Sequence, residues 1–302
     1  DRTGRPLSGV STLLFATSSA LPGAAPAGSV PNPAAGVVVT DGRGRYTITD
    51  EVSAGRYVLV LQRDGYTRVV RRLALEPAAG AVPFDARLTP LAAPAGTLDP
   101  TQGGILESGA LRLEVAAAAV PGTTSVAVRL TAIGEQGLPD FLPLGWTPIA
   151  TVEVRLEEGG VVLPEGLATP FVSDGVHLTL PLPAWVVPTD SLVAVRYDLA
   201  AGAWLVLPDA ERLVGTDGTA LVRLTLSGPG TVAVLRADED PVTAPPQAGA
   251  AGTVLRGSGQ PEIIPAMTAN LTLDPPVVAP TGRATARVVA SSADAASAWP
   301  SG

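Results

Sequence analysis

The 302-residue chain contains no cysteine and no lysine, so all 20 basic residues are arginines. Without cysteine, disulfides, thiolate metal sites and cysteine nucleophiles are excluded, and the redox compartment is left open. Without lysine, a Schiff-base lysine, a phosphate-loop lysine and lysine-based covalent cross-links are excluded. The single histidine, His177, excludes a metal centre built from several histidines.

Aromatic residues make up only 4% of the chain, so its cores have to be built from Val, Leu, Ile and Ala. No apolar run reaches the roughly 18 residues that a membrane-spanning helix needs, so we expect no membrane span. The net charge of −8 disfavours nucleic acid as a partner, because phosphates require a basic surface. This balance is compatible with an exported protein.

Glycine (33 residues) and proline (30 residues) are abundant and stand between short apolar runs. Two such runs, 39–48 and 52–61, are followed by the turn dipeptide Asp64-Gly65. Apolar or alternating runs interrupted about every eight to twelve residues are typical of β-sandwiches. The sequence therefore predicts an all-β fold of tandem β-sandwich domains, immunoglobulin-like or transthyretin-like, joined by Pro/Gly/Ala-rich linkers.

Strict alternation predicts three strands that each bury one face. The residues expected on the buried faces are Val152, Val154 and Leu156; Val176, Leu178 and Leu180; and Val222, Leu224 and Leu226. Residues 111–120 are rich in alanine and compatible with a helix. The Pro121-Gly122 break and the flanking strand pattern favour extended chain there.

Composition divides the chain into five parts. We expect a first sandwich at 1–90, a linker at 91–98, a second sandwich region at 99–237 and a second linker at 238–262. Residues 263–302 carry strand-like patterns, but about forty residues cannot close a sandwich that needs about a hundred. The last part is therefore predicted to be incomplete immunoglobulin-like strands or a donor-strand tail.

The motifs at 1–10, 40–46, 54–57 and 65–66 resemble, in order and spacing, the carboxypeptidase-regulatory-like domain. This family is a transthyretin-like sandwich related to the Cna-B modules of bacterial surface proteins. The resemblance implies an opening strand just before the position of Asp1, so the first sandwich is expected to lack its opening strand. Some Cna-B modules carry a Lys–Asn isopeptide bond, which a chain without lysine cannot form.

Residues 103–115 and 119–130 are similar to the ZU5 domain, a β-sandwich of scaffolding proteins and bacterial modular proteins. The family's Ile-Pro-Pro-Gly-Ala element is replaced here by residues 114–120. Some members cleave themselves at a His-Phe-Ser motif. This chain has Val-His-Leu-Thr at 176–179, without the serine nucleophile, so that activity is not carried over.

Three sets of polar residues are candidate sites of chemistry. His177 is expected on the outer face of a strand without an acid partner, which favours a surface histidine. The run Asp238-Glu239-Asp240 has ligands suited to Ca²⁺ but lacks the full spaced loop, which favours a solvated linker. The paired acids at 157–158 and at 209 and 211 lack neighbouring aromatics to hold a sugar. The sequence thus assigns no catalytic, cofactor-binding or metal-binding residue.

The remaining candidates have an ordinary structural interpretation beside the functional one. The four tryptophans, Trp146, Trp185, Trp204 and Trp299, are either plugs of the sandwich ends or platforms on which a sugar ring stacks. The Gly-Gly pairs at 103–104 and 159–160 are predicted turns. Arg71-Arg72 is predicted to be an exposed strand end.

These patterns lead to a functional hypothesis without an enzymatic role. The chain is predicted to be a non-catalytic structural module of an exported cell-surface or extracellular assembly: a stalk, an adhesin or a filament subunit. Its expected partners are neighbouring copies or other surface proteins, bound by β-augmentation, with strands of 263–302 as donors. The alternative is a glycan- or protein-binding accessory module of a larger secreted protein or hydrolase.

Overall fold

The computed structural model describes residues 4–16, 36–49, 52–75, 84–122, 124–163, 170–172, 174–199, 201–208, 210–238 and 246–257. These residues form sixteen β-strands and one turn of 3-10 helix at Glu135–Gly137, with no α-helix among them. The predicted all-β fold class is therefore confirmed. Within the described residues, no helix is long and apolar enough to span a membrane.

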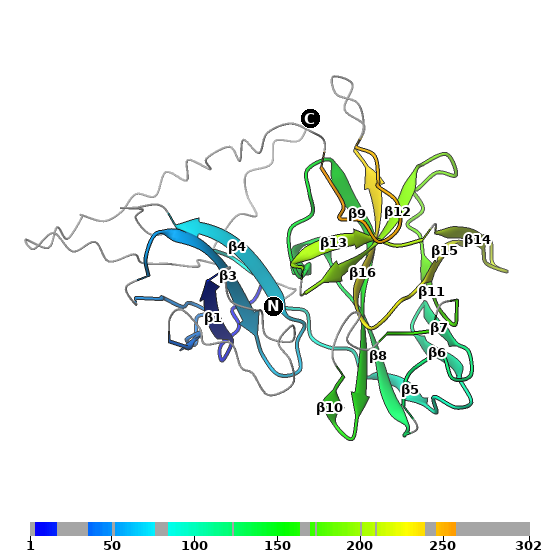
Figure 1. Cartoon of the computed structure of the whole chain (residues 1–302), viewed down its shortest axis with the longest axis horizontal. Helices are drawn as coiled ribbons and strands as arrows, with labels where there is room; N and C mark the ends of the chain where they lie inside the picture. The colour runs from blue at the N-terminus through cyan, green and yellow to red at the C-terminus, as the bar shows by residue number, and fades with distance from the viewer. Residues whose placement is uncertain are drawn as a thin grey trace, which may run out of the picture.

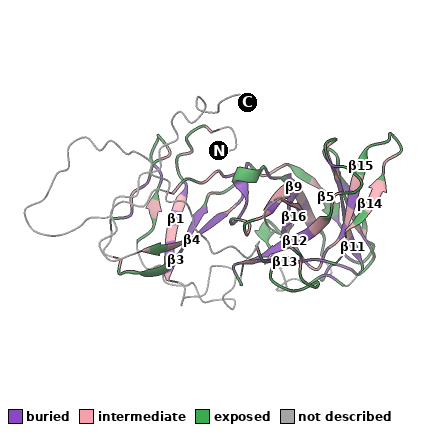
Figure 2. Ribbon diagram, turned by 90° about the horizontal axis from the view of Figure 1, so that it is seen from above, coloured by how far each residue is buried: buried purple, intermediate pink, exposed green. Residues whose placement is uncertain are grey.

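The strands form three antiparallel sheets that follow one another from left to right in Figure 2. The first, here called the N-terminal sheet, has the order β2-β1-β3-β4. Its strands are β1 (Ser11–Ala16), β2 (Val38–Val39), β3 (Gly55–Gln62) and β4 (Val69–Leu75). Figure 1 shows these strands, in blue to cyan, to one side of the rest of the molecule.

The central sheet has the order β13-β12-β16-β9-β8-β5, with β10 paired to β9. Its strands are β5 (Pro94–Leu98), β8 (Val126–Ala132), β9 (Trp146–Glu158), β10 (Val161–Val162), β12 (Leu192–Asp198), β13 (Ala203–Val206) and β16 (Gly230–Ala237). The outer sheet has the order β14-β15-β11-β7-β6. Its strands are β6 (Gly104–Ser108), β7 (Leu111–Val115), β11 (Val176–Pro181), β14 (Glu211–Val214) and β15 (Ala220–Thr225).

The central and outer sheets enclose an aliphatic core, here called the sandwich core. Every apolar residue that alternation predicted to be buried lies in it, including Val154, Leu178 and Leu224. The Ala-rich stretch is extended where β7 runs from Leu111 to Val115, and the chain then turns. The preference for strand over helix is thus confirmed for residues 111–115.

The N-terminal sheet packs on the opposite face of the central sheet through a second core, here called the junction core. It comprises Phe15, Val58, Val60 and Val70 from the N-terminal sheet together with Leu138, Trp146, Val195, Tyr197, Leu199, Trp204, Val206, Ala233, Leu235 and Leu255. Strand β3 is consequently buried on both faces. Val58 and Val60 enter the junction core, while Leu59 and Leu61 face a third cluster inside the N-terminal unit.

Both segments predicted to be linkers contain paired chain. In 91–98, residues 94–98 form β5 against β8, and Leu98 is buried in the sandwich core. The backbone N–H of Ala92 donates to the Thr131 hydroxyl, and Arg129 donates to the Ala92 carbonyl. A Pro/Ala/Gly composition gives no sign of these contacts, because the partners lie more than thirty residues further along the chain.

The second predicted linker, 238–262, is described at 246–257 and in residue 238. Here the chain runs along the outer edge of β13: Val206 N–H donates to the Thr253 carbonyl and Leu255 N–H to the Trp204 carbonyl. Leu255 is buried in the junction core. The predicted third part, 263–302, lies outside the described residues.

Candidate functional site

Arg71 is the residue whose position departs furthest from expectation. It is 4% exposed, so the prediction of an exposed strand end was wrong for it. Its Nη1 donates to the carbonyl oxygens of Val70 (2.8 Å), Leu138 (3.2 Å) and Pro139 (3.1 Å). The guanidinium carbon lies 4.4 Å from the centre of the Phe141 ring. The cation thus joins β4 to the segment that leads into β9.

Arg72, by contrast, is half exposed and pairs with a buried carboxylate, since its Nη2 lies 3.2 Å from Asp140 Oδ2. Asp140 also accepts from the Phe141 backbone N–H at 2.8 Å and from the Tyr197 hydroxyl at 3.5 Å. Burial raises the pKa of Asp140 above its ordinary value of 3.8, and the charge of Arg72 opposes this shift. Burial also lowers the pKa of Arg71, with Asp140 opposing. The junction therefore contains two buried charged groups that partly compensate each other.

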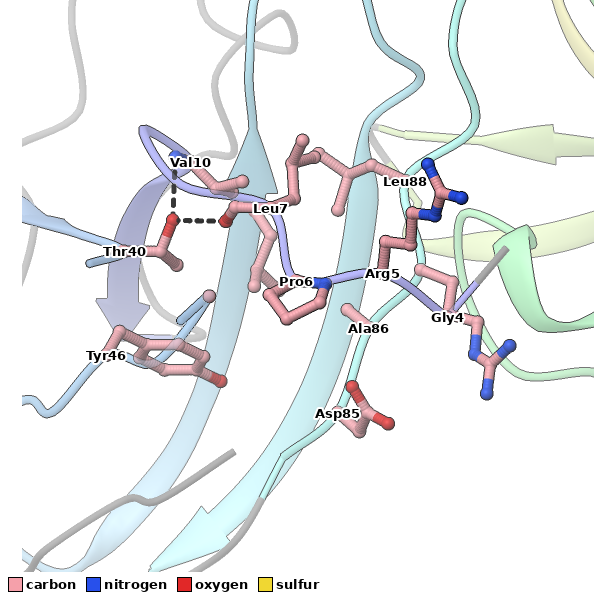
Figure 3. Close-up of a pocket in the computed structure, with 13 residues that line it drawn as sticks. Gly4, Arg5, Pro6, Leu7, Val10, Thr40, Tyr46, Asp85, Ala86 and Leu88 are labelled. Atoms are coloured by element: carbon pink, nitrogen blue, oxygen red, sulfur yellow. Dashed lines mark hydrogen bonds between the residues drawn. The ribbon is translucent and has the colours of Figure 1, made fainter. Parts of the chain in front are cut away.

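A small cavity opens where residues 4–7 cross residues 85–88 (Figure 3). Its volume is about 60 Å³, which is room for a few water molecules and not for a substrate. The Thr40 hydroxyl, which lines it, donates to the Leu7 carbonyl and accepts from the Val10 N–H. Burial, followed by the charge of Asp85, raises the pKa of Tyr46 in its wall, so this phenol stays protonated. The cavity is therefore a small gap in the packing and not a substrate site.

The three tryptophans that the structure describes lie in different environments. Trp146 and Trp204 are buried in the junction core, and their Nε1 atoms donate to the carbonyls of Arg256 (2.8 Å) and Phe141 (3.1 Å). Trp185 lies between β11 and β12 and is 52% exposed. Trp299 lies outside the described residues. Trp146 and Trp204 are therefore buried plugs. Among the tryptophans described, only Trp185 is exposed enough for a sugar ring to stack on it.

His177 lies on the outer face of β11, half buried, as expected from alternation. Its Nδ1 is 3.4 Å from the Thr225 hydroxyl oxygen on β15. Glu114 is its cross-strand neighbour on β7, but that carboxylate is ion-paired with Arg112 and Arg223, each at 3.0 Å. These groups share one surface of the outer sheet.

Two of the acidic candidates, Asp238 and Glu157, are held by neighbours within the protein. Asp238 Oδ1 accepts from the Thr147 hydroxyl, and Glu239 and Asp240 lie outside the described residues. Glu157 accepts two hydrogen bonds from Arg129, at 2.9 and 3.2 Å. Asp209 is also outside the described residues, and Glu211 begins β14 on the surface. Among the residues described, no three metal-ligating side chains come together.

The Gly159-Gly160 pair occupies a turn, as predicted, whereas Gly104 begins β6 and Gly103 forms a β-bridge with Asp99 directly before it. Gly159 and Gly160 have φ angles of 57° and 83° and connect β9 to β10. Gly103 has a φ of 68°, and an added Cβ there would lie 2.3 Å from the Val115 carbonyl oxygen. Glycine is required at this position by both the backbone angle and the close approach.

Scans against protein-family models, curated proteins and solved structures all return no match to this chain. The resemblances to the carboxypeptidase-regulatory-like and ZU5 domains therefore stay predictions from the sequence.

Proposed function

We propose that this protein is a non-catalytic structural module of an exported cell-surface or extracellular assembly, as a stalk, adhesin or filament subunit. The observation that supports the proposal most strongly is the junction core. This core fixes the relative position of two units that the sequence predicts as separate domains joined by a linker. The three sheets therefore form one continuous body. A module that transmits force or sets a spacing needs a fixed relation between its parts.

The strength of this connection follows from what is buried. Phe15, Tyr197 and Trp204 are large aromatic side chains, and each contributes roughly 1.5–3 kcal/mol or more when removed from water. Arg71 adds hydrogen bonds from a cation to two carbonyl groups across the same boundary, those of Leu138 and Pro139. A flexible Pro/Gly-rich linker would instead let the two units reorient independently.

Assembly by strand donation has a candidate acceptor edge in the N-terminal sheet. Strand β1 pairs with β3 along its full length, from Ser11 to Ala16. On its other side β2 pairs only with Ser11 and Thr12. Within the described residues, the apolar end of β1 is therefore open on one side, where an incoming strand would find unpaired backbone groups.

Electron microscopy of the purified chain and of a variant that lacks residues 263–302 tests the assembly. Fibres from the full chain that disappear in the shortened variant support strand donation, and fibres that persist refute it.

Protease treatment of intact producing cells tests location. Loss of the protein from intact cells is expected, whereas protection until the cells are lysed would contradict an exposed extracellular position.

A further inference from the structure

One end of the sandwich gathers polar and aromatic groups that the structural role does not use. The segment between β11 and β12 presents Trp185 there, and the next residue, Val186, is buried in the sandwich core. The Val186 N–H donates to the Pro183 carbonyl at 3.0 Å. The exposed indole thus lies on a turn that the buried Val186 side chain fixes to the sandwich core.

The indole is also supported from the side by charged residues of the neighbouring strands. The guanidinium carbon of Arg236, at the end of β16, lies 5.1 Å from the centre of the Trp185 ring. Asp190 lies 4.0 Å from Arg236 and accepts from the Val187 N–H at 2.9 Å. Arg212 of β14 donates to the carbonyls of Val187 and Asp190. These contacts order the turn before any ligand arrives, which lowers the entropic cost of binding.

Charged groups of both signs lie at this end of the sandwich. Arg212 and Arg236 are accompanied by Asp190 and by Asp238, which directly follows β16 and accepts from Thr147, the cross-strand partner of Arg236. Trp185 is joined by the half-exposed Val187, so the surface is apolar in its middle and polar around it. A ligand with an apolar face and hydroxyl edges fits both parts.

We propose that this end of the sandwich binds a neutral carbohydrate. A pyranose ring stacks its C–H face on the exposed side of Trp185, and its hydroxyl groups exchange hydrogen bonds with the arginine and aspartate side chains around it. Tryptophan suits this role because it offers a large rigid surface with little side-chain entropy to lose. The site goes beyond the structural role and does not depend on filament formation.

The test uses the full chain and an array of neutral oligosaccharides: cellohexaose, xylohexaose, mannohexaose and chitohexaose. Binding to at least one is expected, followed by titration calorimetry with that sugar. Trp185→Ala should weaken binding at least tenfold, and Trp185→Phe should retain part of it. The matched control is Phe141→Ala, because Phe141 is 66% exposed and also lies beside an arginine, yet belongs to the junction. The affinity of the Phe141→Ala variant for the sugar should equal that of the unaltered chain.

Thermal unfolding of Trp185→Ala checks that the fold is intact, and little change is expected because the side chain is half exposed. The proposal is overturned if no neutral oligosaccharide binds, or if Trp185→Ala and the unaltered chain bind equally. Binding only to a protein partner through Trp185 would also overturn it, because tryptophan and arginine are favoured anchors of protein interfaces. None of these outcomes alters the electron-microscopy test of assembly.

Discussion

The two faces of the central sheet carry two different kinds of core. The sandwich core is built almost entirely from Val and Leu, with Phe171 as its one aromatic member among the described residues. The junction core has four aromatic members, Phe15, Trp146, Tyr197 and Trp204, in a chain with few aromatics. Alternating aliphatic strands are enough to join two regular sheets, whereas larger side chains fill the space where irregular segments also enter.

The junction core is also bordered by buried charged groups. The junction contains Arg71 and Asp140, both buried, and Tyr197 contacts the carboxylate. Such groups are costly to bury unless they are paired, so they favour one arrangement of the two units over others. The comparison indicates that the sandwich core supplies stability and the junction core supplies a defined orientation.

The largest expected effect comes from removing a junction aromatic. Trp204→Ala should destabilise the protein by about 3–5 kcal/mol, because it leaves a large cavity and an unpaired Phe141 carbonyl. Urea denaturation followed by hydrogen exchange should show the N-terminal sheet losing protection before the sandwich. A loss spread evenly over all three sheets would contradict the division into two cores.

The matched substitution in the sandwich core is Leu224→Ala, which should cost about 2–5 kcal/mol. Here the central and outer sheets should lose protection together while the cluster inside the N-terminal unit keeps more of its own. Leu221→Ala, on the half-exposed face of the same strand, serves as the control and should change the free energy of unfolding much less.

Two adjacent arginines sharpen the comparison. Arg71→Ala should cost about 2–3 kcal/mol, because three carbonyl groups lose a charged donor. Arg72→Ala removes a half-exposed partner of Asp140 and should cost about 1 kcal/mol or less. Chemical denaturation of both variants measures the difference, and equal effects would refute the burial of Arg71.

The smallest effect is a dependence on pH. Burial raises the pKa of Asp140 in the folded protein, so the folded state binds the proton more tightly than the unfolded state. Its contribution to stability is therefore most favourable below the unfolded pKa and is lost as pH rises through the folded pKa. The melting temperature of Asp140→Asn relative to the unaltered chain should increase over this window. A difference that falls with rising pH would contradict the assigned direction.

Much of the sandwich could be predicted from sequence, and much of the junction could not. The pattern Val222-Arg223-Leu224 alternates because one face of β15 meets the central sheet, and that relation is visible locally. On β9 the same reasoning was incomplete, because Glu153 on the other face is buried too. Arg71 and Arg72 look alike in sequence, and only the carbonyls of residues 138 and 139, 67 and 68 positions away, distinguish them. For the same reason the sequence could not separate the exposed Trp185 from the buried Trp146 and Trp204.

The most direct test of the central claim is the distance between the two units in solution. Because the chain has no cysteine, Gln62→Cys on β3 and Glu107→Cys on β6, both exposed, can be spin-labelled without background. Double electron–electron resonance should give one narrow distance distribution in the unaltered background, and a broader one when Trp204→Ala is added. A broad distribution already in the unaltered background would mean that the two units move independently, and would contradict the account.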